Sequence, residues 1–295
     1  MELKGILAGR SVFAQALILL AIIFAGFVLA GLVSLVFTAS SPSAMLDPDV
    51  LRWTQLLSEI LMFLLPALVV AWLCSANLSD YLSLKMIPDG NVWAGAFVSM
   101  LLLSPVVTFI GYLNAQMKLP AFMASIEQWM QQMEEIAAQA TELMFAGNGW
   151  VALVFNLIVI ALAAGVCEEF FFRGTLQRII GRKFANYHAI IWITAIIFSI
   201  IHLQFYGFVP RVLLGAYFGY LLYWSKSIWL PVFAHFLNNA FAVIGMSDQD
   251  LKENAIVSGE IPDSEVLNYA LASIVASGLF FFCAKYLYRR LQHVD

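Results

Sequence analysis

Charged side chains are scarce in this sequence of 295 residues. Asp, Glu, Lys and Arg together account for 12% of the chain, against about 25% in a typical soluble protein. They are also unevenly distributed, because long stretches of the chain contain none of them, among them 11–46, 60–79, 90–117, 143–167, 184–210 and 227–247. Uncharged apolar runs of about 18 or more residues are typical of helices that cross about 30 Å of hydrocarbon. The pattern therefore excludes an ordinary soluble domain.

Other signatures are missing as well. No segment alternates apolar and polar residues over about ten positions, which excludes the strands of a transmembrane barrel. The net charge is −4 and no basic tail is present, so nucleic acid is not an expected partner. The three cysteines, Cys74, Cys167 and Cys283, lack CxxC spacing and lie in or beside apolar runs. That placement favours packing over disulfides or metal binding.

Apolar residues make up 62% of the chain, and their distribution predicts an all-α polytopic transmembrane bundle of about eight spans. The whole chain, 1–295, is interpreted as a single integral membrane domain. The first apolar run is far longer than the 7–15 residues of a signal-peptide core, so it is read as a span. The sixth span has only 14 residues between Arg211 and Lys226 and is expected to be short, tilted or re-entrant. The eight predicted spans are about 12–37, 57–76, 92–114, 150–172, 186–204, 208–224, 228–246 and 267–287.

The basic residues predict the orientation of these spans. If the N-terminus is cytoplasmic, eleven of the fifteen Lys and Arg residues fall in cytoplasmic segments, as positive charges do in membrane proteins. An even number of spans then places the C-terminus in the cytoplasm too. The four exceptions would lie in outer segments or near the outer ends of spans: Arg52, Lys118, Arg211 and Lys252.

One outer segment, residues 119–146, has the pattern of an amphipathic helix. Its apolar side chains lie opposite four acidic ones, Glu127, Glu134, Glu135 and Glu142. Membrane-surface helices are usually rich in Lys and Arg, and this one is acidic. Two interpretations remain open. The segment is either a substrate-gating or partner-binding element, or a solvated connector that rests on the bundle.

Polar and ionisable residues inside spans are costly, about 2.5–3.5 kcal/mol for a carboxylate at mid-bilayer, and therefore mark functional sites. Glu168 and Glu169 end the fourth predicted span and His202 lies late in the fifth. The seventh contains His235, Asn238 and Asn239. The turn between spans four and five centres near residue 185, and Glu168 and His202 are each 17 residues from it. At 1.5 Å per residue, both lie about 25 Å from the tip of the hairpin and are expected to face each other.

These residue types suit the hydrolysis of an amide by water. A carboxylate shielded from solvent is a usable general base, and a histidine opposite it can orient the attacking water. A second histidine and an asparagine amide are suitable donors to a developing oxyanion. A carboxylate and two imidazoles also suit zinc, with Glu168, His202 and His235 as ligands, so a metal-assisted reaction stays open even though HExxH is absent. His188 and His293 are expected at the surface.

Three motifs in this region resemble those of the CAAX prenyl endopeptidase and bacteriocin-processing (Abi, CPBP) family of intramembrane proteases. Residues 168–173 read EEFFFR and match EExxxR, residues 198–202 match FxxxH, and residues 235–239 match HxxxN. They occur in the family's order on successive apolar segments. The resemblance covers about residues 150–245, and the catalytic core is placed at about 150–246.

The resemblance implies a role for each matching residue. Glu168 and His202 would activate water, His235 and Asn239 would stabilise the oxyanion, and Glu169 and Arg173 would support the site. It also implies a glutamate-dependent reaction without an essential metal, with zinc as the alternative. The expected surroundings are membrane lipid and a peptide or membrane-protein substrate, in a prokaryotic inner membrane.

Two other functions compete with the protease. A transporter or proton-coupled carrier could use Glu168 and His202 as a proton relay, but the inverted repeats and broken spans typical of such proteins are not found in the sequence. A non-catalytic membrane scaffold is the second rival. The intact set of Glu168, His202, His235 and Asn239 argues against it.

Overall fold

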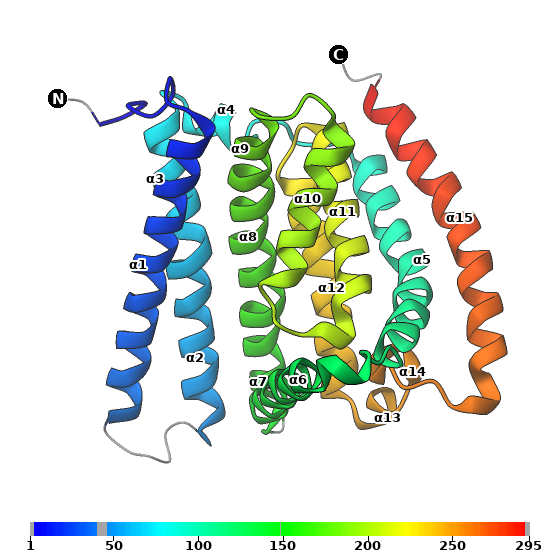
Figure 1. The fold of residues 1–295 in the computed structure, drawn as a ribbon. Coiled ribbons are helices and arrows are strands. Elements are labelled where there is room, and N and C mark those ends of the chain that lie inside the picture. Colours follow the sequence, from blue (N-terminus) through cyan, green and yellow to red (C-terminus); the bar gives the residue numbers. More distant parts are fainter. Residues whose placement is uncertain (1–2, 40–45, 148, 293–295) are drawn as a thin grey trace.

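A computed structural model describes residues 3–39, 46–147 and 149–292, which form helices and connecting turns without any strand in those ranges (Figure 1). Seven of the described helices are long and apolar enough to cross a membrane, and an eighth apolar helix is shorter. The protein is therefore a multi-pass α-helical membrane protein, which confirms the predicted fold class.

Each predicted span corresponds to a helix. The seven long helices are α1 (Val12–Ala39), Pro48–Cys74 with α2 (Pro48–Glu59) and α3 (Leu65–Cys74), α5 (Gly90–Ala115), Trp150–Gly181 with α7 (Trp150–Asn156), α8 (Ala164–Glu169) and α9 (Gln177–Gly181), α11 (Phe208–Ser225), α12 (Trp229–Ser247) and α15 (Val266–Gln292). The shorter apolar helix is α10 (Tyr187–Ile200). Outside the spans lie α4 (Leu78–Tyr81), α6 (Ala124–Phe145), α13 (Gln249–Lys252) and α14 (Ala255–Ser258).

The structure differs from the prediction for three spans, in the bounds of the second and fifth and in the expected character of the sixth. The second begins at Pro48 rather than near residue 57, because Asp47 accepts hydrogen bonds from the N–H groups of Asp49 and Val50 and starts a helix there. The sixth, α11, is a full helix of 18 residues, so the expectation of a short or re-entrant segment is wrong. The short one is the fifth, α10, with 14 residues. His202 consequently lies just beyond the end of α10 and not within it.

Two ends of the bundle can be distinguished. The segment that leads into α1 and the end of α15 lie at the same end, whereas α6, α13 and α14 lie at the opposite end (Figure 1). This arrangement fits an even number of crossings. Which end faces the cytoplasm stays a prediction.

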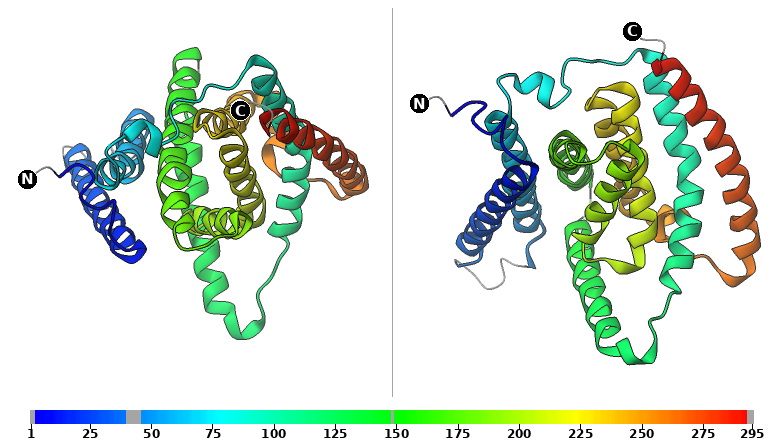
Figure 2. Two further views of the ribbon diagram at one scale, coloured as in Figure 1. Left: turned by 90° about the horizontal axis from the view of Figure 1, so that it is seen from above. Right: turned by 45° about the horizontal axis from the view of Figure 1, so that its top comes forward.

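The helices form a central group with pairs on either side. Figure 2 shows α10, α11 and α12 beside the helix of residues 150–181, with α1 to α3 on one flank and α5 and α15 on the other. The contacts between α10 and α11, between α8 and α12, and between α5 and α15 agree with this view. The residues predicted to carry chemistry all lie in the central group.

The helix of residues 150–181 is irregular around its acidic residues. Wider π-type turns occur at Leu157–Ala163 and Phe170–Leu176, directly before and after α8. Such turns shift the direction of side chains and are frequent at functional sites. Gly165 lets this helix approach α12 closely, because a Cβ there would lie 3.2 Å from the backbone nitrogen of Phe236. This face of the helix therefore packs closely against α12.

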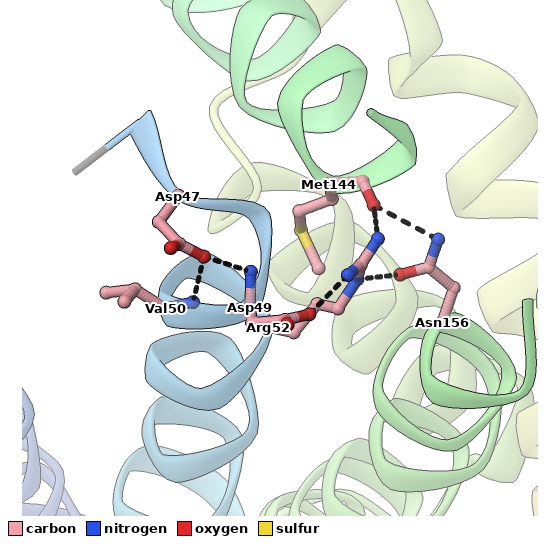
Figure 3. A network of polar contacts seen from close by, with 6 residues as sticks. All are labelled: Asp47, Asp49, Val50, Arg52, Met144 and Asn156. Carbon is pink, nitrogen blue, oxygen red and sulfur yellow. Dashed lines mark hydrogen bonds and ion pairs between the residues drawn. The ribbon is translucent and has the colours of Figure 1, made fainter. Parts of the chain in front are cut away.

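A buried arginine connects three segments at the α6 end of the bundle (Figure 3). Arg52 is only 3% exposed, and its guanidinium donates to Asn156 Oδ1 at 2.8 Å and to the carbonyl of Met144 at 2.5 Å. It also pairs with the exposed carboxylate of Asp49 at 2.6 Å. The sequence placed Arg52 in an outer segment, and the early start of α2 instead draws it into the first turns of the helix.

We expect Arg52→Ala to lower the free energy of unfolding by about 2–3 kcal/mol, because hydrogen bonds made by a charged donor contribute about 1.5–3 kcal/mol and their acceptors would stay buried. Chemical unfolding in detergent micelles measures the change. Arg52→Lys, which keeps the charge and loses the planar fork, should have an intermediate effect. Equal stability of Arg52→Ala and wild type would show that these contacts do not hold α2, α6 and α7 together.

Candidate active site

A cavity of about 400 Å³ lies within the central group of helices. Glu168 reaches it from α8, His202 from the turn after α10, and His235 and Asn239 from α12. The four residues predicted to be catalytic thus line one cavity, although they come from three separate segments. Most of the other lining side chains are apolar or aromatic and restrict access of bulk water: Val107, Ile160, Phe198, Pro210, Leu214, Phe218 and Ala242.

The carboxylate of Glu169 lies beside this cavity and contacts both Arg173 and His235. Glu169 is completely buried, and its Oε1 accepts from Arg173 Nη1 and interacts with His235 Nδ1, each at 2.8 Å. The contact between Glu169 and Arg173 is the i,i+4 pair expected from the sequence. His235 belongs to α12, so the same carboxylate joins two spans and fixes the direction of the imidazole.

Arg173 is held from several sides and is only 1% exposed. Its second terminal nitrogen donates to the carbonyl of Gly215 in α11 at 3.0 Å. The guanidinium lies over the ring of Phe198, 4.6 Å from its centre, and over Phe218 at 5.4 Å. Gly215 is needed there, because a Cβ at that position would lie 3.2 Å from the guanidinium.

The hydrogen bond of His202 determines which of its nitrogens faces the cavity. Its Nδ1 lies 2.7 Å from the carbonyl oxygen of Phe198, which can only accept, so Nδ1 carries the hydrogen. In the neutral ring the lone pair is then on Nε2. His202 can therefore accept a proton from a group in the cavity.

Glu168 supplies the second basic group. Its side chain is 7% exposed, and Oε2 is buried without a hydrogen-bond partner among the described residues. A buried carboxylate oxygen that lacks a donor is costly and is expected to bind a water or a substrate group. Glu168 thus has no described hydrogen bond, whereas its neighbour Glu169 is paired through Oε1 and leaves only its own Oε2 without a partner.

Two polar side chains on α12, His235 and Asn239, also reach the cavity. The ring of His235 stacks on Phe218 at 5.1 Å between centres, and because Nδ1 faces Glu169, Nε2 is the nitrogen left for the cavity. Asn239 donates one amide hydrogen to the carbonyl of Ile160 at 2.9 Å and retains a second. Asn238 donates to Asn239 Oδ1 at 3.1 Å within α12, so it orients that amide.

Two ionisable residues near the cavity were not predicted as site residues. Arg211 lines the cavity, where its guanidinium binds the carbonyl and side-chain oxygens of Gln204 at 3.1 and 2.8 Å. Glu59 ends α2 and is 5% exposed, and α2 packs against α8, which carries Glu168. The sequence could have identified Glu59, because it is an ionisable residue inside the predicted span 57–76. Arg211 was interpreted only as a marker of topology.

The acidic outer segment forms α6, as the amphipathic pattern predicted. Trp129 contacts the ring of Phe205 at 5.4 Å between centres, so α6 rests on the turn that leads into α11. Burial raises the pKa of the Glu134 carboxyl above its usual value, although the N–H groups of Tyr206 and Phe205 and the charge of Arg211 oppose the rise. The helix thus lies beside the cavity. Gating, partner binding and a purely connecting role stay predictions.

The residues named as zinc ligands do not form a metal centre in this arrangement. Within residues 3–39, 46–147 and 149–292, no group of three His, Cys, Asp or Glu side chains has the spacing that a metal ion requires. Glu168, His202 and His235 nevertheless line the same cavity, so the zinc-assisted alternative stays a prediction. Elsewhere, His188 is exposed as expected, and the prediction for His293 lies outside the described residues.

Comparisons with known proteins support the resemblance drawn from the motifs. Residues 150–241 match the family model of the type II CAAX prenyl endopeptidases, Rce1-like. A Bacillus subtilis (strain 168) protein, YdiL, whose name describes it as a proposed membrane peptidase, is 30% identical over 93 residues. These cover 32% of this chain and 38% of that relative. No solved structure is significantly similar. The predicted resemblance is confirmed over the matched segment.

We expect Arg173→Met to lower the free energy of unfolding by about 3–5 kcal/mol, because it leaves the buried carboxylate of Glu169 without its permanent cation. Adding Glu169→Gln should recover part of that loss, since the neutral amide does not need a charged partner. Thermal unfolding of the single and double variants in detergent tests this coupling. Arg289→Met, at an exposed position, is the matched control. A double variant as unstable as Arg173→Met would refute the explanation.

Proposed function

We propose that this protein is an intramembrane endopeptidase that hydrolyses a peptide bond with a water molecule activated by Glu168 and His202. The observation that carries this proposal is one cavity lined by the unpaired carboxylate of Glu168, the imidazoles of His202 and His235 and the amide of Asn239. The match of residues 150–241 to the type II CAAX prenyl endopeptidases supports the same reaction class. The substrate is a peptide or a membrane protein that enters this cavity.

In the first step, the unpartnered oxygen of Glu168 accepts a proton from the water while Nε2 of His202 orients it. The water oxygen forms a bond with the carbonyl carbon of the substrate, and the carbonyl π electrons move to its oxygen. A buried general base of this kind contributes about 10²–10⁴-fold to the rate. The apolar walls keep further water away and strengthen the electrostatic interactions within the cavity.

The negative charge that develops on the carbonyl oxygen requires donors on the opposite wall. The remaining amide hydrogen of Asn239 is one such donor. His235 is the second when both of its nitrogens carry hydrogen, a form that the carboxylate of Glu169 stabilises at Nδ1. Glu169 and Arg173 are therefore positioning residues. They act through His235 and do not line the reacting side of the cavity.

In the second step, the tetrahedral intermediate collapses and the carbon–nitrogen bond breaks. The proton taken up by Glu168 passes to the departing nitrogen, so the two products are an amine and a carboxylic acid, and the acid then transfers its proton to the amine to give an ammonium and a carboxylate. No covalent intermediate with the protein is needed, and each proton has a defined donor and acceptor. The cycle returns Glu168 and His202 to their starting states.

We expect Glu168→Ala and His202→Ala each to reduce cleavage by at least about 100-fold, because each removes one of the two groups that activate the water. Comparative proteomics of membranes from wild-type and Glu168→Ala cells identifies uncleaved peptides as substrates. Cleavage of one such peptide by the purified variants then measures the loss.

The exposed Glu142→Ala on α6 serves as the matched control and should cleave at the wild-type rate. Thermal unfolding of all variants verifies that they fold, and loss of the unpaired carboxylate should leave the stability of Glu168→Ala undiminished. Wild-type turnover in either Glu168→Ala or His202→Ala would refute the assigned roles.

Metal dependence distinguishes the proposed reaction from its zinc-assisted alternative. We expect the purified enzyme to keep its activity after prolonged treatment with a strong chelator, because its own side chains supply the base and the oxyanion donors. Activity assays before and after dialysis, with metal analysis of each sample, measure this. Loss of activity that zinc restores would instead assign Glu168, His202 and His235 as ligands.

A further inference from the structure

A second pocket, of about 290 Å³, opens at the other end of the central helices. It is bounded by the end of the helix of residues 150–181, the start of α10, the end of α11 and the turn before α5. Its most polar lining residues are Arg173, Gln177, Arg178 and Lys226. None of these belongs to the lining of the catalytic cavity.

The charged side chains that line this pocket are all cationic. Three cationic side chains contribute to its lining, and no described lining residue is acidic. Arg173 is balanced by Glu169, and Arg178 uses one nitrogen on the carbonyls of Asp80 and Tyr81 at 3.2 and 2.7 Å. Lys226 is exposed and forms no described ion pair. The pocket therefore has an excess of positive charge, which favours an anion.

Two buried groups in the lining lack partners and have opposite hydrogen-bonding character. Nε of Arg173, a donor, and Oε1 of Gln177, an acceptor, have no partner among the described residues, and the two side chains are 1% and 8% exposed. A ligand that satisfies both must combine an anionic oxygen with a hydroxyl or an N–H group.

The position of the pocket along the bundle indicates the source of such a ligand. Gly181, Tyr187 and Lys226 all stand at or just beyond helix ends, where spans emerge from the hydrocarbon. Tyr187 and Tyr223 stack at 4.2 Å between ring centres, and tyrosines gather at the membrane interface. Basic pockets between spans at this level are suited to lipid headgroups.

We infer that this pocket binds the phosphate group of a phospholipid whose headgroup also carries a hydroxyl, such as phosphatidylglycerol. Lys226 and Arg178 receive the phosphate together with Nε of Arg173, and the hydroxyl donates to Gln177. The acyl chains extend along the outer faces of α10 and α11. This site shares Arg173 with the support of the proposed active site, and lipid binding is tested without any substrate.

The test titrates full-length protein in non-ionic detergent with phosphatidylglycerol, phosphatidylcholine or inorganic phosphate and follows thermal unfolding. Native mass spectrometry counts the lipids that remain bound. We expect phosphatidylglycerol to stabilise the wild type more than phosphatidylcholine. Lys226→Asn should weaken its binding about fivefold, equivalent to the roughly 1 kcal/mol that a basic residue contributes at this depth. Asparagine suits position 226, where φ is +54° and the backbone is left-handed.

Two controls separate the pocket from general surface charge. Lys226→Arg keeps the cation and should keep the wild-type affinity, and Lys183→Asn removes an exposed lysine that does not line the pocket. Equal stabilisation by inorganic phosphate would support an anion site that does not require lipid. Unchanged binding in Lys226→Asn, an equal loss in Lys183→Asn, or no response to any of the three probes would overturn the inference.

Discussion

The buried carboxylate of Glu169 is the contact on which the rest of the candidate site depends. It has no exposure to solvent, so its charge must be balanced within the protein, and Arg173 and His235 do so from two helices. Arg173 in turn reaches α11 through the carbonyl of Gly215. One charge thus determines the relative positions of three spans, and through His235 it sets the geometry of the cavity wall.

The membrane fold was predictable because each span is determined by the apolar side chains of its own segment. Uncharged apolar runs identify every span, and the motifs identify Glu168, His202, His235 and Asn239, which the structure brings to one cavity. The bounds were harder to predict. The cap formed by Asp47 extends the second span by about nine residues, and a cap of this kind is a weak signal beside a strongly apolar run.

Site residues that lie outside the three motifs could not be predicted from the spacing of those motifs. Glu59 belongs to α2, outside the segment that carries the motifs, and it comes near α8 only because the second span packs against that helix. Arg211 enters the cavity because Gln204, in the turn before α11, holds its guanidinium. Both placements result from tertiary packing, which the apolar pattern of a single span does not encode.

The shortness of α10 has a consequence for how water reaches the interior. Fourteen residues span about 21 Å, whereas the hydrocarbon layer is about 30 Å thick. The chain beyond Ile200 is non-helical, contains His202 and is covered at its far end by α6. Lipid cannot pack against such backbone without leaving its polar groups unsatisfied, so the bilayer must thin there or admit solvent. The early end of α10 therefore places His202 at the part of the bundle where lipid packs least well.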